Sequence, residues 1–546
     1  MAITVDQLLD AAINRNLVEA DVLVRLRADA KRLRVNLLEL VTAHYRIPVS
    51  ALYQAYAEVR GLLFIDPVLA SPPESLVKKL PQSLMQRKLV LPLEEQTEAI
   101  LVAVADADDR VTLESVQRML GRPLKLALAE PGALQVCINR TLSKITGARS
   151  TAEVDVVALL DEIFREAFLR RSSDIHLLPE ENGLRVRLRV DGRLQDYLPS
   201  SEGADASALV SRVKVLSNLD IAEQREAQDG GFSYRLPPPI DREFNIRVAT
   251  APTRLGERVT MRLLGGQESS TITLPDLGMA EEDLQLFRQA IRKPFGMILL
   301  TGPTGSGKST TLFAALQEIA HPEINIMTVE NPIEYFMEGV SQVQTGHKIT
   351  FAEALRSFLR HDPDVLMVGE IRDEETADVA LKAAMTGHLV FSTLHTNTAC
   401  GTVVRLADIG CEAYLIGSTM NAVIAQRLVR RLCPHCRQPR VPTAEEQDKL
   451  KITNSVILYD PKGCAACQGK GYRGRLGLYE TLWFDSDLSR FVSRGCDEES
   501  LEAYAGPRLR YMWQDGREKV LQGMTTFEEL CEVAVLKEAK PKVAEV

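Results

Sequence analysis

A phosphate-binding loop is the feature that most constrains the fold of this chain of 546 residues. An apolar run over residues 297–300 leads to Gly302, four further residues, and then Gly307, Lys308 and Ser309. Glycines at this spacing let backbone N–H groups surround a β-phosphate, while the lysine reaches the β/γ oxygens and the serine hydroxyl is left for Mg²⁺. The residues expected to bind ATP are Gly302, Thr304, Gly305, Ser306, Gly307, Lys308, Ser309 and Thr310.

The flanking sequence supports this interpretation. A buried-strand pattern precedes the loop, and residues 311–316 open a helix whose N-terminus favours anions. Apolar runs at 324–329, 365–368 and 389–391 then alternate with amphipathic segments. This alternation predicts an α/β fold in which helices cover both faces of a parallel sheet and a nucleotide lies at the carboxyl ends of the strands.

Length and charge narrow the class of protein further. At about 150 residues per domain the chain should hold three or four domains. The formal net charge of −9 argues against a nucleic-acid partner, because binding phosphates needs clustered lysine and arginine. No apolar stretch approaches the roughly 20 residues that span a bilayer, and the first residues lack the basic start and apolar core of a secretory signal. The sequence therefore predicts a cytoplasmic protein without a transmembrane segment.

Two regions precede the loop. Residues 1–145 show helical periodicity and strand-like runs but no clustered chemistry, which favours an interaction domain. The polar stretch 143–153 is a candidate linker. One long helix over 156–171 and several short strands follow, and in these strands arginines alternate with apolar residues, so that all arginines of a strand share one face. That face is either solvated or offered to phosphates, and the pattern alone leaves both open.

Acidic groups follow two of the predicted strands. Glu370 comes after the run at 365–368, where phosphate-loop enzymes place the acid that faces Mg²⁺ and water. Gly369 stands where many such enzymes have an aspartate ligand, so the metal would depend on Ser309, waters and another carboxylate. Glu330 and Glu334 are both candidates for that carboxylate. His395 follows a third strand, and both a structural role and a γ-phosphate role stay open for it.

Four of the nine cysteines form two C-x₂-C pairs separated by 27 residues. Thiolates at this spacing converge on one tetrahedral ion, so the pairs predict a closed, structural Zn²⁺ site. A thioredoxin-like redox role is the competing interpretation, but it needs one pair and not two. The predicted ligands are Cys433, Cys436, Cys464 and Cys467.

From about residue 155 to 532 the chain resembles the secretion ATPases of type II secretion and type IV pilus assembly, the GspE/PilB family. Residues 328–335 resemble the family's Asp box, with Asn331 where aspartate is usual, and residues 359–373 resemble its Walker B segment. Residues 393–397 resemble its His box. The motifs at 173–176 and 228–230 are similar to its second N-terminal domain, and residues 1–145 to its first.

The resemblance implies a RecA-like ATPase core and a cytoplasmic homohexamer, peripheral at the inner membrane, that contacts platform proteins of the machine through its N-terminal domain. It implies catalytic roles for Glu370, Glu334 and His395, and arginines Arg247 and Arg262 that reach the nucleotide, with Arg356 and Arg360 as matching arginines of the core. The four-cysteine knuckle is shared with assembly and secretion members and disfavours pilus retraction. Residues 34–39 depart from the family's cyclic-dinucleotide motif, so that ligand is not predicted.

These observations divide the chain into five parts. We expect an N-terminal α/β interaction domain (1–145), a second, PAS-like α+β domain (154–268), the RecA-like core (276–427), a zinc-binding subdomain (428–480) and a C-terminal helical region with a tail (481–546). The expected cofactors are ATP, Mg²⁺ and Zn²⁺. The alternatives are a DNA-moving, conjugation-type ATPase, which the acidic charge opposes, and a nucleotide-gated scaffold with little turnover.

Overall fold

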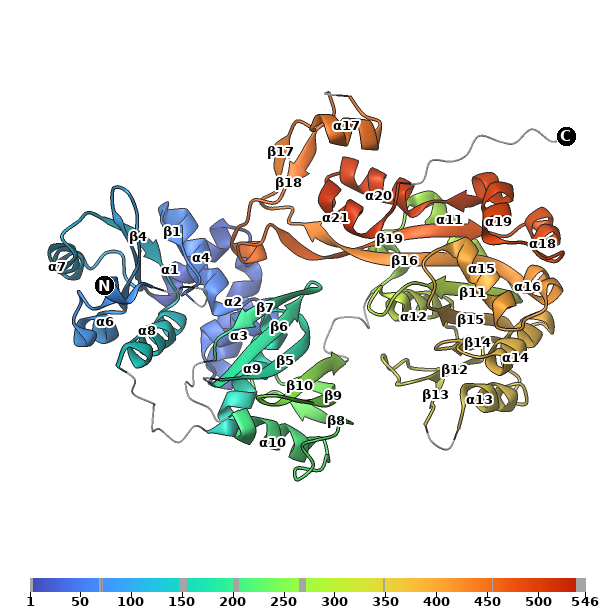
Figure 1. Cartoon of the computed structure of the whole chain (residues 1–546), viewed down its shortest axis with the longest axis horizontal. Coiled ribbons are helices and arrows are strands. Elements are labelled where there is room, and N and C mark those ends of the chain that lie inside the picture. Colours follow the sequence, from blue (N-terminus) through green and yellow to red (C-terminus); the bar gives the residue numbers. More distant parts are fainter. Residues whose placement is uncertain are drawn as a thin grey trace. The chain divides into compact units, whose positions relative to one another are not determined.

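The structure is a computed structural model that describes residues 3–67, 70, 72–146, 155–181, 183–199, 206–264, 272–346, 349–453 and 455–536 (Figure 1). The chain divides into two compact units. The first comprises residues 1–267 and 462–473, and the second comprises residues 268–461 and 474–546.

The beginning of the first unit combines helices with a small mixed sheet. Its helices are α1 (Val5–Asn14), α2 (Ala20–Leu33), α3 (Leu37–Tyr45), α4 (Val49–Arg60), α5 (Glu74–Val77), α6 (Gln82–Lys88), α7 (Arg110–Leu120) and α8 (Pro131–Thr146). Its strands lie in the order β1 (Leu63–Phe64), β4 (Leu124–Leu128), β3 (Ile100–Val104), β2 (Val90–Glu95). The expected linker at 143–153 is partly wrong, because α8 continues to Thr146; residues 147–154 lie outside the described ranges.

A six-stranded antiparallel sheet forms the rest of the first unit. Its order is β7 (Arg193–Tyr197), β6 (Gly183–Val190), β5 (Ser172–Glu180), β10 (Gly256–Leu264), β9 (Glu243–Thr253), β8 (Gln228–Arg235). Helices α9 (Val156–Leu169) and α10 (Ala206–Leu216) share an apolar core with one face of this sheet. The predicted helix 156–171 ends two residues early because Arg171 adopts a left-handed conformation with φ 57°.

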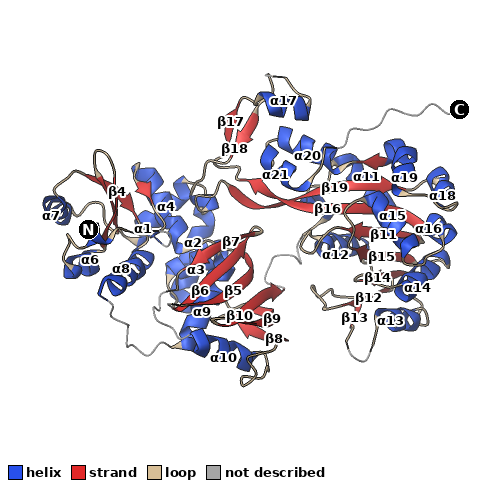
Figure 2. Ribbon diagram, in the orientation of Figure 1, coloured by secondary structure: helices blue, strands red, loops and turns tan. Residues whose placement is uncertain are grey.

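An eight-stranded sheet organises the second unit (Figure 2). Its order is β13 (Ser341–Gln344), β12 (Ile326–Glu330), β14 (Val365–Val368), β15 (Leu389–Leu394), β11 (Gly296–Thr301), β16 (Met420–Leu432), β19 (Tyr472–Trp483), β20 (Leu509–Arg510). Pairing is parallel from β13 to β16. The predicted strand 389–391 extends to Leu394, because residues 389–394 pair with β11 along its whole length.

Both faces of this sheet are buried, as the alternating sequence predicts. Met297 and Leu299 of β11 join a core with α13 (Phe351–Phe358), α14 (Glu374–Met385), α15 (Ala399–Asp408) and α16 (Ala413–Thr419). Ile298 and Leu300 point the opposite way, into a core with α11 (Glu281–Ala290) and α12 (Lys308–Ile319). Successive residues of a strand face opposite sides, so one apolar strand supplies both cores. The expected parallel α/β sheet is confirmed.

The remaining elements follow β16. The two-stranded sheet β17 (Gln438–Arg440) and β18 (Leu458–Asp460) and the helix α17 (Ala444–Leu450) lie between the two cysteine pairs in sequence. A short 3₁₀ turn, η4 (Ala465–Cys467), contains the last cysteine of the second pair. The C-terminal helices are α18 (Ser486–Val492), α19 (Glu498–Ala505), α20 (Met512–Leu521) and α21 (Phe527–Val533).

Candidate nucleotide and metal sites

The phosphate loop links the end of β11 to the start of α12, as the sequence predicts. Gly302 has φ 141°, a conformation that residues with a side chain rarely adopt. A Cβ atom there would also lie 2.4 Å from the carbonyl oxygen of Gln426 on β16. Glycine at this position therefore lets the loop turn sharply against the neighbouring strand.

Lys308 lies buried inside the loop. Its Nζ donates to the carbonyl oxygens of Gly302 at 2.7 Å and Pro303 at 3.3 Å. Burial lowers its pKa to about 8, against the opposing attraction of Glu370 and Glu334. The lysine thus lies within the electrostatic influence of two carboxylates that follow other strands, and an anion bound in the loop would further favour its charged form.

The hydroxyl groups of the loop differ in their surroundings. Ser306 is buried, and its Oγ has no hydrogen-bond partner within the described residues. Thr304 and Ser309 are exposed. Thr310 Oγ1 lies 3.2 Å from the Tyr335 hydroxyl. A buried hydroxyl without a partner is costly unless a ligand satisfies it, and Ser309, in the first turn of α12, offers an oxygen to a metal.

Glu370 and His395 meet at the carboxyl ends of the adjacent strands β14 and β15. The Glu370 side chain is only 14% exposed and accepts a bond of 2.6 Å from an Nη atom of Arg372. The other Glu370 oxygen lies 3.5 Å from Nε2 of His395. The two groups that the sequence proposed for γ-phosphate chemistry are therefore neighbours, and Arg372 holds the carboxylate in place.

Glu330 and Glu334, the two candidates for the metal-binding carboxylate, differ in their surroundings. Glu330 is buried at the end of β12, where its Oε1 accepts bonds from Thr328 Oγ1 at 2.7 Å and Gln342 Nε2 at 3.0 Å. Its carboxylate is thus engaged within the sheet. Glu334, by contrast, acts electrostatically on Lys308.

The structure gives a physical reason for Gly369. A Cβ at this position would lie 3.3 Å from the carbonyl oxygen of Val329 and 3.4 Å from Cα of Glu330. The Gly369 N–H also donates to Val329 O at 2.8 Å. An added Cβ would therefore be tight against the end of β12, which would have to shift by a few tenths of an ångström to make room.

Sequence reasoning missed two contributions from β16. Gln426 is buried, and its Oε1 accepts a bond of 2.9 Å from Thr311 Oγ1 in α12. Arg427 donates to Asn397, which follows β15. Their polar side chains stand just after a run of buried apolar residues, which was the available signal, but only the strand order shows that β16 lies beside the loop.

The two predicted arginines lie in the first unit, whereas the loop lies in the second, so their role stays a prediction. Arg247 of β9 and Arg262 of β10 are direct cross-strand neighbours. Arg262 Nε pairs with the buried Asp174 of β5 at 2.9 Å, and Asp174 also lies 3.6 Å from Nε of Arg189. In the core, Arg356 pairs with Glu375 at 2.7 Å, and Arg360 donates to the Arg356 carbonyl oxygen at 2.9 Å.

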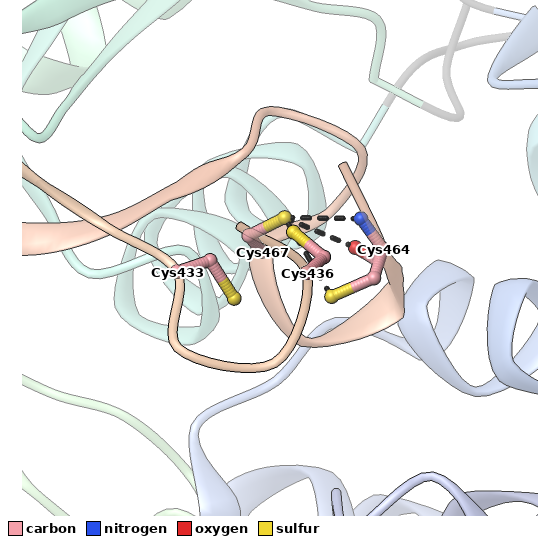
Figure 3. A group of neighbouring side chains, drawn as sticks. All are labelled: Cys433, Cys436, Cys464 and Cys467. Atoms are coloured by element: carbon pink, nitrogen blue, oxygen red, sulfur yellow. Dashed lines mark hydrogen bonds between the residues drawn. The ribbon is translucent and has the colours of Figure 1, made fainter. Parts of the chain in front are cut away.

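The four predicted cysteines form one cluster (Figure 3). Their sulfur atoms all lie within 4.8 Å of one another. Cys467 Sγ accepts bonds of 3.1 Å from the N–H groups of Cys464 and Gly471, which favour a thiolate. The sulfurs of Cys464 and Cys467 are 3.8 Å apart, close to the roughly 3.8 Å edge of a tetrahedron with Zn–S bonds of about 2.3 Å. The donor set therefore fits a structural Zn²⁺.

A phosphate loop on a two-faced parallel sheet, with acidic groups at neighbouring strand ends, defines a P-loop ATPase with a RecA-like core. Comparisons with known proteins agree. Residues 150–532 match the family described as "Type II/IV secretion system protein", and residues 60–148 match the family described as "MshEN domain". The chain belongs to this family of secretion ATPases, which confirms the predicted family, ATP hydrolysis, and ATP and Mg²⁺ as cofactors.

Three relatives illustrate the similarity. The chain is 46% identical over 383 residues to the type II secretion system protein E of Dickeya dadantii, which covers 70% of this chain and 76% of the relative. It is 38% identical over 510 residues to the type IV pilus assembly ATPase PilB of Thermus thermophilus, covering 88% of this chain and 57% of the relative. The Legionella pneumophila ATPase DotB matches in structure with a TM-score of 0.52 at 21% identity, over 71% of this chain and 97% of DotB, which supports the fold alone.

In the described part of the chain, none of the helices combines the length and the apolar character that crossing a bilayer requires.

Proposed function

We propose that this ATPase powers the assembly of pilin or pseudopilin fibres in type IV pilus biogenesis or type II secretion. The convergence of Lys308, Glu370 and His395 at one edge of the sheet is the observation that carries the proposal. The similarity to a secretion protein and to a pilus assembly ATPase is compatible with both machines.

The residues have distinct roles in this proposal. Lys308 and the loop N–H groups hold the phosphates, and Ser309 with Glu334 and waters holds Mg²⁺. When bound there, Mg²⁺ would neutralise part of the negative charge on the phosphate oxygens. Glu370 orients the attacking water, and His395 lies beside the γ-phosphate, with its Nε2 3.5 Å from a Glu370 carboxylate oxygen.

The charge developing on the γ-phosphate needs a further cation, which Arg247 and Arg262 supply from a neighbouring subunit of a homohexamer. Their side chains are exposed cross-strand neighbours, and of the two only Arg262 has a recorded carboxylate partner, Asp174, among the described residues. The five-part division of the chain given above belongs to the same proposal.

The N-terminal domain contacts platform proteins at the inner membrane, so the motor works at the cytoplasmic face. The match of residues 60–148 to an MshEN domain supports a separate module at this end of the chain.

Two variants test the assignment. Lys308→Ala removes the cation that binds ground-state phosphate, so it should abolish ATP binding. Glu370→Gln should keep ATP binding and lose hydrolysis, because its role begins with the attacking water. Equilibrium binding of ATP·Mg²⁺ and phosphate release measure the two effects. Equal loss of binding in both variants would contradict the role of Glu370.

A further inference from the structure

Arg427 bridges the sheet where the phosphate loop begins. It lies on β16, on one side of β11, and its Nη2 donates to Asn397 Oδ1 at 3.0 Å. Asn397 follows β15, which lies on the other side of β11. The guanidinium therefore crosses the carboxyl end of β11, and its Nη1 would lie 3.1 Å from a Cβ atom built on Gly302.

The described residues include no ion pair between Arg427 and a carboxylate, although the charge of Glu480 attracts it. The Arg427 side chain is half-buried. Its two recorded bonds go to neutral oxygens, those of Asn397 and the Gln426 backbone at 3.2 Å. Burial lowers the pKa of Arg427, and its charge in turn helps to lower the pKa of Lys308. Two partly desolvated cations beside one loop repel each other, and an anion that lies between them would relieve this repulsion.

We propose that Arg427 is a phosphate ligand of this site, supplied by the same chain as the loop, and that Asn397 positions it. The inference rests on the proposed ATP-binding function and deepens it. A guanidinium can donate two parallel bonds to phosphate oxygens, which a lysine cannot. The bond to Asn397 uses one N–H donor of Arg427 and keeps the guanidinium beside the phosphate loop.

Nucleotide affinity tests the role of Arg427. In the Glu370→Gln background, where ATP stays intact, Arg427→Ala should raise the Kd for ATP·Mg²⁺ about 10- to 100-fold, the usual effect of losing charge-assisted hydrogen bonds. Arg427→Gln, which keeps most of the side-chain volume, should do the same. The matched control is Arg431→Ala, an exposed arginine of the same strand, which should leave the Kd unchanged. Equal affinity in all these variants overturns the proposal.

A double-mutant cycle tests the role of Asn397. Asn397→Ala should raise the Kd several-fold when Arg427 is present and have no effect in the Arg427→Ala background, because it acts only through the guanidinium. Equal losses in both backgrounds would overturn the positioning role. The unfolding temperature without nucleotide should stay the same in each variant, while the increase produced by saturating ADP should shrink.

Failure of this inference can be told apart from failure of the proposed function. If Lys308→Ala loses ATP binding and the Arg427 variants do not, only the role of Arg427 is wrong. If Lys308→Ala and Arg427→Ala both bind ATP as tightly as the unmodified chain, the ATP site itself is wrong.

Discussion

The four-cysteine site and the nucleotide site are assembled in different ways. Each cysteine pair presents two thiols from one tight turn, so most of its ligand geometry is set within four residues. The nucleotide site instead collects groups that follow β11, β12, β14 and β15, together with residues of β16. Its composition therefore depends on strand order, and a change far away in sequence can alter it. Two short turns of the chain therefore specify the metal ligands, whereas the order of the strands in the sheet brings the phosphate-binding groups together.

The largest effect is expected when the four-cysteine site alone is removed. Cys464→Ser with Cys467→Ser should lower bound zinc from one ion per chain to none. The binding free energy of a structural Zn²⁺ site is about 10–16 kcal/mol in small zinc domains, and two thiolates alone cannot provide it. ATP affinity should change much less, since the phosphate-binding groups are elsewhere. Metal analysis of the purified variant measures the first effect, and nucleotide titration the second.

A control sharpens the zinc prediction. Cys496→Ser with Cys531→Ser removes two cysteines outside the cluster and should keep full zinc. Full zinc stoichiometry in the Cys464/Cys467 variant would rule out the assigned ligands.

The second-largest expected effect comes from the arginines Arg247 and Arg262, and it tests whether they belong to the nucleotide site. Arg262→Ala should lower turnover about 10³-fold while ATP still binds, the effect of losing an arginine that meets the transition-state charge. Arg247→Ala should do the same, and it is the cleaner variant, because no ion pair is recorded for Arg247 in the described ranges. Mixing inactive Arg262→Ala with inactive Glu370→Gln subunits should restore activity if the arginine acts in trans. Activity of the mixture is measured as phosphate release over a range of total protein concentration.

Arg254→Ala is the matched control, because Arg254 lies between β9 and β10 and its side chain is 87% exposed. Its turnover should equal that of the unmodified chain. Turnover per chain that stays constant from dilute to concentrated protein would argue against the ring mechanism.

The same contrast explains what could be predicted from the sequence. The loop, its strand and helix, and the cysteine cluster were predictable because neighbouring residues specify them. The alternation of apolar runs with amphipathic segments after the loop also predicted a sheet buried on both faces. The bridge from Arg427 to Asn397 was not predictable, because it joins strands on either side of β11. The choice of Glu334 over Glu330 likewise needed the bond from Gln342 to Glu330.

A smaller effect should appear as pH dependence. Burial lowers the pKa of Lys308 to about 8, and phosphate binding needs its charged form. The Kd for ATP should therefore rise with pH, about tenfold between pH 7 and pH 9, because most lysines have lost their proton at the higher value. Lys308→Arg keeps its charge throughout and should give a flat profile. An unchanged Kd over this range in the unmodified chain would show that Lys308 stays charged without a ligand.

The smallest effect is expected at Gly369. Variants at this position test whether packing between β12 and β14 is the reason that no metal-binding side chain is present there. Gly369→Ala should lower stability by roughly 1–3 kcal/mol, because its Cβ would press on Val329 O and Glu330 Cα, 3.3 and 3.4 Å away. Gly346→Ala is the matched control, since a Cβ there meets nothing within 4 Å. Thermal unfolding compares the two.

Gly369→Asp then separates packing from metal binding. The new carboxylate would restore the aspartate that many phosphate-loop enzymes use, but its Cβ would displace the end of β12, whose next residues lead to Glu334. We therefore expect ATP turnover a few-fold below that of the unmodified chain and stability at or below that of Gly369→Ala. A variant that is as stable as the unmodified chain and turns over ATP faster would show that the edge of the sheet has room for another metal ligand. Strand packing would then not be the reason for glycine at this position.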